Sequence, residues 1–201
     1  MEFASKNMTV GELNAIVKIL GGEEGARSLL RGELVISRAS RVLNHLKFIA
    51  ETIEISISSF TKSSFFKTDG PVRLWFGDNF KSWILPAIPE EIPGFEGKLT
   101  QTQLTKDMTD SEIKQGLGQP ESLTPTEFAA VIRHLIERQP QGEAGTLLTN
   151  GYANIFYVKL EDERVVAVRA HWDSDYRGWG LGADDLGDFG WRGGSCVFLR
   201  S

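Results

Sequence analysis

Hydrophobic and polar positions alternate most regularly in the last fifty residues of the chain. Two apolar runs, Ile155–Leu160 and Val165–Trp172, are joined by the four charged residues Glu161–Arg164. A short charged connection between two such runs is typical of an antiparallel β-hairpin. Because successive side chains of a strand point to opposite faces, the hairpin should have one apolar and one mixed face. The apolar face should carry Phe156, Val158, Leu160, Val166, Val168, Ala170 and Trp172.

Four other segments have the pattern of strands. Cys196–Leu199 and the shorter Trp179–Ala183 continue the apolar, glycine-punctuated character of the C-terminal region. Upstream, Ile53–Phe60 alternates strictly and Val72–Phe76 is a compact apolar run. Together with the hairpin these segments predict an antiparallel sheet that places one face on a core and the other in water.

The clearest helical periodicity lies between residues 125 and 138. Thr124 and Glu127 form a capping box, and Pro125 stands at the first helical position. A second capping box, Thr109 with Glu112, predicts a shorter helix. We expect the longer helix to pack on the apolar face of the sheet through one stripe of side chains, Phe128, Val131, Ile132, Leu135 and Ile136.

The N-terminal region is expected to be helical. A capping box at Thr9 opens one predicted helix, Gly21-Gly22 ends it, and Glu23–Leu30 forms a second. Apolar spacing also predicts a helix over Ala39–Ala50. The predicted fold class is α+β, with an N-terminal helical hairpin in residues 1–37 and, in residues 38–201, a main domain whose antiparallel sheet packs on one or two helices.

Several motifs resemble a group of small uncharacterised bacterial proteins from uncultured lineages. In the C-terminal region they are LLTNGYANIFYV, then V-x-A-V-x-x-x-W, then W-G-x-x-A, and a glycine-rich turn into VF-x-R. The N-terminal run GELNAIVKILGGEEGARSLLRGELV is similar to the opening of other proteins from the same sources. The two matches cover under half of the chain, and they imply a modular organisation without assigning an activity.

Composition and charge narrow the classes of function. The 201 residues are 41% hydrophobic and carry a net charge of −5, with a pI near 5.3, which disfavours a nucleic-acid protein that depends on bulk positive charge. A DNA-binding regulator that uses a helix-turn-helix-like segment in residues 9–31 remains an alternative. The single Cys196 fits a reducing compartment, and no apolar run reaches the length of a membrane span. We therefore expect a cytoplasmic protein.

The sequence offers little for metal, cofactor or nucleophilic chemistry. His45, His134 and His171 are scattered, without a second His or Cys at ligand spacing, so we predict no transition-metal site and no cofactor. C-terminal aspartates on glycine-rich turns leave calcium binding open. His171 with Asp173 or Asp175 leaves a hydrolase or nuclease as an alternative function.

Aromatic and acidic residues gather between residues 172 and 191. The candidate binding residues are Trp172, Tyr176, Trp179, Trp191, Asp173 and Asp175. The structural interpretation is a small second core beneath long loops. The functional interpretation, which we prefer, is a non-enzymatic interaction or ligand-binding protein that presents these aromatic groups on loops of the C-terminal sheet. The acidic residues favour a basic or neutral partner, either a protein or a small ligand, over a nucleic acid.

Overall fold

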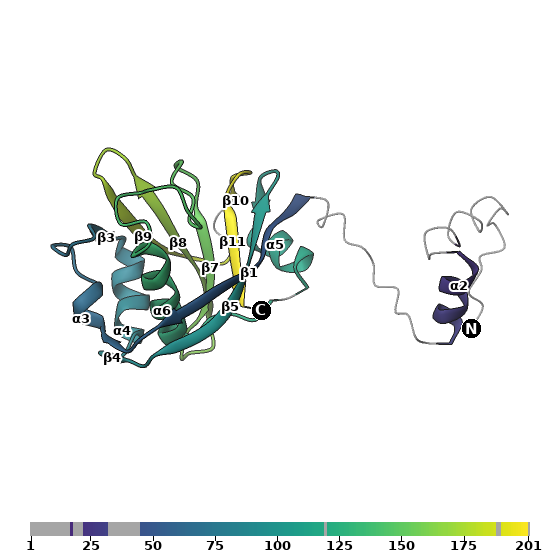
Figure 1. Ribbon diagram of the computed structural model, residues 1–201, viewed down its shortest axis with the longest axis horizontal. Helices are drawn as coiled ribbons and strands as arrows, with labels where there is room; N and C mark the ends of the chain where they lie inside the picture. The colour runs from purple at the N-terminus through teal and green to yellow at the C-terminus, as the bar shows by residue number, and fades with distance from the viewer. Residues whose placement is uncertain (1–16, 18–21, 32–44, 119, 188–189, 201) are drawn as a thin grey trace. The chain divides into compact units, whose positions relative to one another are not determined.

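The computed structural model of the protein describes residues 17, 22–31, 45–118, 120–187 and 190–200 (Figure 1). The chain divides into two compact units, Met1–Ala39 and Ser40–Ser201. In the first unit, helix α2 (Glu23–Leu30) coincides with the second predicted helix. The first predicted helix and the boundary between residues 37 and 38 fall outside the described residues, apart from Val17. The predicted helical hairpin and its boundary therefore stay predictions.

The second unit is built on a seven-stranded sheet, so the α+β class is confirmed. Four of its six strand pairings are antiparallel, and two, β11 with β7 and β3 with β9, are parallel. The wholly antiparallel sheet that we expected is thus wrong at two pairings, because the last strand inserts between β5 and β7 and an early strand joins the far edge. In spatial order the strands are β1 (Leu46–Ile57), β5 (Phe95–Leu104), β11 (Cys196–Arg200), β7 (Asn154–Lys159), β8 (Val165–Asp173), β9 (Gly178–Asp185) and β3 (Leu74–Phe76).

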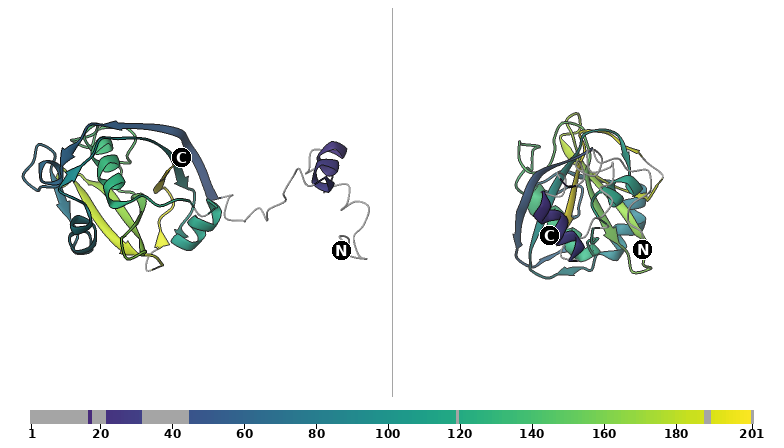
Figure 2. Two further views of the ribbon diagram at one scale, coloured as in Figure 1. Left: turned by 90° about the horizontal axis from the view of Figure 1, so that it is seen from below. Right: turned by 90° about the vertical axis from the view of Figure 1, so that its right-hand side faces the viewer.

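Helix α6 (Pro125–Ile136) packs against one face of this sheet, as expected (Figures 1 and 2). The capping box forms: Thr124 Oγ1 accepts the amide of Glu127 at 3.2 Å, and the Glu127 carboxylate accepts the amide of Thr124 at 2.9 Å. The predicted apolar face of the β7–β8 hairpin lies in the same core as the buried helix stripe, with the rings of Phe128 and Phe156 5.7 Å apart. The helix ends at Ile136, two residues before the predicted end.

The opposite face of the sheet is covered in part by a second, smaller core. Helix α5 (Asp110–Gly116) and the short strands β6 (Met108–Thr109) and β10 (Gly190–Trp191) contribute to it. On the sheet it includes Tyr157, which the hairpin pattern placed on the mixed face. The middle of that face is therefore buried, and the part of it near β8, β9 and β3 keeps exposed side chains. The members of this core include Leu104, Met108, Ile113, Ile155, Tyr157, Ala167, Trp191, Val197 and Leu199.

The predicted helix over Ala39–Ala50 is wrong where the structure describes it, because Leu46–Ala50 belongs to edge strand β1. Pairing with β5, which places Leu46 opposite Leu104, overrides the helical spacing of the apolar residues. No helix among the described ranges is long and apolar enough to cross a membrane. The remaining short elements are β2 (Phe60–Thr61), α3 (Lys62–Phe65), η2 (Phe80–Ile84), α4 (Leu85–Ala87) and β4 (Glu91–Ile92).

Candidate functional site

The three tryptophans of the predicted binding face lie inside the protein. Trp179 is 0% exposed, Trp172 9% and Trp191 5%. Trp172 and Trp179 are partners across β8 and β9 on the core face, with rings 5.6 Å apart, and Trp179 Nε1 donates to Gln139 O at 2.9 Å. The expectation that these indoles would be presented on loops is wrong, because Trp172 and Trp179 face the main core from strands β8 and β9, and Trp191 of β10 lies in the smaller core. Tyr176, in the β8–β9 turn, is 68% exposed.

The aspartates of the same region are engaged in local structure. Asp173 Oδ1 accepts the amides of Asp175 at 2.9 Å and of Tyr176 at 3.0 Å, so its carboxylate shapes the β8–β9 turn. Asp184 pairs with Arg169 at 3.3 Å. The carboxylates of Asp173 and Asp184 are therefore engaged by the fold, while Asp175 is exposed in the turn. Within the described ranges no three His, Cys, Asp or Glu side chains gather as a metal site would require.

The exposed ring of Trp75 lies instead over the outer face of strand β9, where Gly178, Gly180 and Gly182 alternate with core residues. A Cβ on Gly180 would lie 2.2 Å from Trp75 Cζ2 and 2.6 Å from His171 Cε1. A Cβ on Gly182 would lie 2.9 Å from Arg169 Nε. The glycines thus let side chains from β3 and β8 approach the backbone of the strand closely. The rings of Trp75 and His171 meet edge to face, 5.0 Å apart.

Two hollows share Trp75 as a wall. The first has a volume of about 400 Å³ and the second about 510 Å³. We call the surface around them the Trp75 face, defined by Arg73, Trp75, Tyr152, Arg169, His171 and Tyr176. Trp75 and Tyr152 are each 38% exposed. The first hollow is lined by Trp75, Gly151, Tyr152, Ala153, Arg169, His171, Gly190, Trp191, Arg192 and Ser195, and the second by Thr68, Arg73, Leu74, Trp75, Asp173 and Tyr176.

Contacts from behind and beside the surface hold the Trp75 face in place. Arg73 Nη1 donates to Tyr176 O at 2.8 Å and ties β3 to the β8–β9 turn. The ring of Tyr152 rests on Gly194, where a Cβ would lie 3.0 Å from it. These contacts reduce the freedom that the exposed side chains would lose on binding a ligand.

The buried carboxylate of Asp110 fixes the wall that Trp191 contributes to the first hollow. Its Oδ1 accepts from Trp191 Nε1 at 2.7 Å and from the Tyr157 hydroxyl at 2.9 Å, and its Oδ2 accepts the amide of Gly187 at 3.3 Å. Burial and the neighbouring Asp110 charge raise the pKa of Tyr157, so its hydroxyl stays protonated and keeps donating. Trp191 therefore presents its ring to the hollow, while its N–H is already bonded.

His171 is the residue of the first hollow that the enzymatic alternative would use as a base. Burial lowers its pKa and the Arg169 charge lowers it further, while Asp173 opposes the shift, so the imidazole is neutral at pH 7. Asp173 directs one carboxylate oxygen to backbone amides of the turn. Within the described ranges, no hydrogen bond joins His171 to a carboxylate or to a serine. The site thus has a neutral base without an oriented nucleophile.

Several residues of the two hollows were not predicted as candidates from the sequence, among them Trp75, Tyr152, Arg169 and Arg192. The signal for Trp75 was present, because Val72 and Leu74 are buried and strand alternation then points Trp75 outward. Nothing in the sequence marked Tyr152 or Arg192, which come from separate connecting segments.

Comparison with known protein families, with curated proteins and with solved structures finds no match to this chain.

Proposed function

We propose that the protein is a non-enzymatic ligand-binding protein whose binding surface is the Trp75 face. The observation that carries this proposal is an exposed tryptophan that forms the common wall of two hollows. Trp, Tyr and Arg side chains dominate binding energy at recognition surfaces because they bury large areas with few rotatable bonds or make several directed hydrogen bonds. All three residue types meet here.

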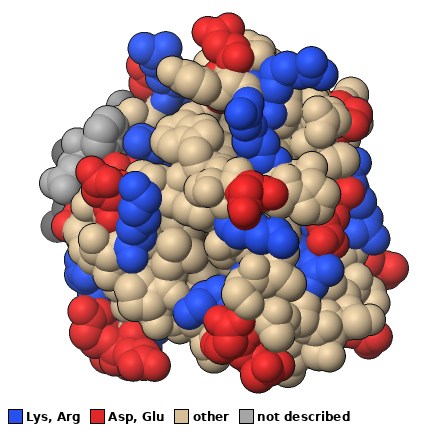
Figure 3. Space-filling view, turned by 90° about the vertical axis from the view of Figure 1, so that its left-hand side faces the viewer, with Lys and Arg blue, Asp and Glu red and all other residues tan. Residues whose placement is uncertain are grey.

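The location of the exposed aromatic residues supports a binding role. An indole that is 38% exposed leaves apolar area in water, which folding alone does not favour. Trp75 stands at the edge of the sheet, yet its ring is seated on Gly180 and against His171, so it is held in place. The side of the molecule that carries α3 and β3 shows positive and negative groups interspersed with uncharged surface (Figure 3). Such a surface suits a small ligand better than a polyanion.

The enzymatic alternative rests on His171, a neutral base inside the first hollow. It would need a nucleophile or water oriented by a neighbouring group, and the hydrogen bonds that Asp173 accepts come from backbone amides of the turn, through Oδ1. We therefore place binding ahead of hydrolysis.

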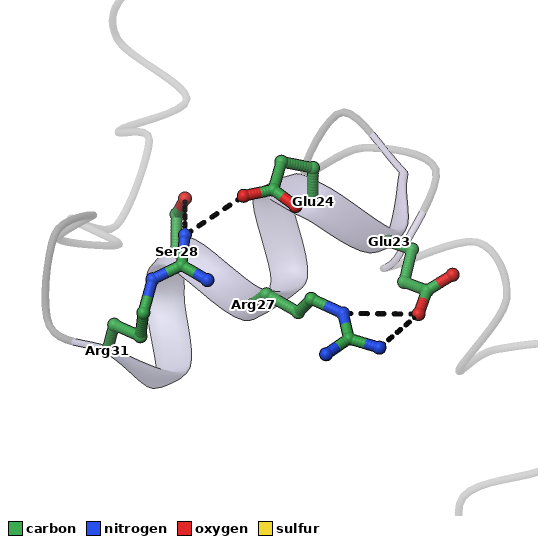
Figure 4. A network of polar contacts seen from close by, with 5 residues as sticks. All are labelled: Glu23, Glu24, Arg27, Ser28 and Arg31. Carbon is green, nitrogen blue, oxygen red and sulfur yellow. Dashed lines mark hydrogen bonds and ion pairs between the residues drawn. The ribbon is translucent and has the colours of Figure 1, made fainter.

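The DNA-binding alternative is disfavoured by the polar contacts of helix α2 (Figure 4). Arg27 bonds Glu23 through Nε at 3.1 Å and Nη2 at 2.5 Å, and Arg31 Nη2 bonds Glu24 at 3.0 Å. These pairs balance the basic charge of the helix within the helix itself. A recognition helix would instead direct its arginines to phosphates and base edges.

The test is a screen of small aromatic compounds by ligand-detected NMR, followed by Trp75→Ala. We expect the wild-type protein to yield binders and the variant to bind them at least about tenfold more weakly, because the shared wall of both hollows is removed. Phe48→Ala is the matched control, since Phe48 is an exposed aromatic residue on β1, at the other edge of the sheet. Unchanged affinity in Trp75→Ala would refute the proposal, and so would an equal loss in the control.

A further inference from the structure

The first hollow has a distinctive charge. The charged side chains among its lining residues are Arg169 and Arg192, and its lining includes no Asp or Glu among the residues that the structure describes. The whole chain carries 27 acidic residues against 22 basic ones. A hollow lined by two arginines in an acidic protein therefore differs in sign from the molecule around it, and this difference favours an anion inside it.

We propose that the first hollow binds a small anionic ligand that joins a planar ring to a carboxylate or phosphate group. The inference rests on the proposed binding function and adds the chemical class of the ligand. The ring would lie among the aromatic walls formed by Trp75, Tyr152 and Trp191, and the anionic group would be bound by Arg192 and Arg169.

The two arginines have different roles. Arg169 lies over Gly182 and is paired with Asp184 at 3.3 Å, so its guanidinium is held in one place and part of its charge is balanced. Arg192 is exposed, and in the described part of the chain its side chain has no hydrogen bond or ion pair. A guanidinium binds the two oxygens of a carboxylate or phosphate in parallel. Arg192 is therefore the principal anion-binding group, and Arg169 adds a fixed positive charge.

The remaining lining favours a planar group. Trp191 presents only its ring, because its N–H is bonded to Asp110. Gly151 and Gly190 contribute no side chains to the lining, and a Cβ added at either would meet no heavy atom within 4 Å. The volume of about 400 Å³ is large enough to hold a small planar ring. The neutral imidazole of His171 can offer one hydrogen bond without adding charge.

Matched ligands test the inference on the full chain. Indole-3-acetate and indole-3-acetamide share a ring and nearly the same shape but differ by one negative charge. We expect the wild-type protein to bind the acetate at least about fivefold more tightly in an NMR titration at low salt, with a smaller ratio at high salt. In Arg192→Gln the ratio should fall to the smaller preference that Arg169 alone gives, while the affinity for the acetamide stays the same. Trp75→Ala should weaken both ligands.

Each other outcome has a defined meaning. Equal binding of the two ligands by wild type, with loss of both in Trp75→Ala, would overturn the anion inference and leave the proposed function intact. Tighter binding of the acetamide, or no binding of either ligand at millimolar concentration, would also overturn the inference; the fragment screen then decides the proposed function separately. An unchanged preference for the acetate in Arg192→Gln would remove the anionic site from this hollow. Phenyl phosphate compared with benzoate distinguishes a phosphate site from a carboxylate site.

Discussion

Asp110 shows how one residue connects the core to the candidate site. Asp110 is 1% exposed at the first position of α5, and the bonds its carboxylate accepts come from uncharged donors, Trp191, Tyr157 and the amide of Gly187. A buried carboxylate is tolerated when such donors replace the water it has lost. The sequence revealed the capping box around Thr109 and Glu112, but the three donors come from distant segments, so no local pattern could reveal this network.

Replacing Asp110 with Ala should destabilise the protein by about 2–3 kcal/mol, because two buried side-chain donors would lose their acceptor. Asp110→Asn is the matched control, since its amide oxygen can still accept from Trp191 and Tyr157, and it should cost less. Urea unfolding followed by circular dichroism measures both free energies. A cost below about 0.5 kcal/mol in Asp110→Ala, the level of an ordinary surface substitution, would contradict this account of the network.

Among the elements, strand β9 carries both the core and the candidate surface. Its Trp179, Leu181 and Ala183 lie in the core, while the alternate positions Gly178 and Gly180 support side chains of β3 and β8. The pattern of Trp179–Ala183 predicted a strand, whereas the region around it was expected to form loops that expose tryptophans. Alternation along the strand places Gly180 outward and Trp179 inward. The strand pattern was therefore sufficient to predict that Trp179 is buried. Residues from other segments, such as Tyr152, could not be placed without the fold.

Gly180→Ala should displace the indole of Trp75 with a limited cost to stability. The new Cβ would lie 2.2 Å from Trp75 Cζ2, and the ring can move because it is half-exposed and is the far end of a side chain. We expect a destabilisation of about 1–2 kcal/mol, within the range for overpacking, together with weaker ligand binding. Acrylamide quenching of tryptophan fluorescence should increase as the ring turns toward water.

Gly77→Ala is the matched control for Gly180→Ala. Gly77 follows β3 directly, and a Cβ there would meet Gly182 Cα at 3.6 Å, an ordinary contact distance. Its unfolding free energy and fluorescence quenching should stay close to those of the wild type. Equal effects of the two substitutions would show that the close approach to Trp75 is not the cause.

In the molecule as a whole, a mixed sheet has α6 on one face and α5 on part of the other. The first arrangement was predictable, since the capped helix stripe and the apolar hairpin face are both strong local patterns. The position of α5 depends on which strands pair with each other, for example on the insertion of Cys196–Arg200 between β5 and β7. Such pairing is set by contacts between distant segments, and the candidate site follows from it.

Two histidines that pack on opposite faces of the sheet connect global stability to pH. His134 of α6 is buried, and its Nδ1 lies 3.0 Å from Ser56 O of β1, a carbonyl that can only accept, so Nδ1 carries the proton. Burial lowers the pKa of His134, and the charge of Arg138 lowers it further. The Ser56 hydrogen bond and Glu137 oppose this shift. Burial likewise lowers the pKa of His171. Below the ordinary histidine pKa of about 6.5, the unfolded chain therefore binds more protons than the folded chain.

Stability should consequently be fully present above about pH 6.5 and should decrease as the pH falls toward the lowered values of the folded state. Urea unfolding between pH 7.5 and 5.5 measures this slope. Glu90 and Glu112 do not contribute to it, because their pKa values are lowered and they therefore titrate below this pH window. His134→Asn, whose amide can still donate to Ser56 O, should flatten the slope, and adding His171→Asn should flatten it further. A wild-type stability that is constant or rises on acidification through this window would show that the two imidazoles are not held neutral by the fold.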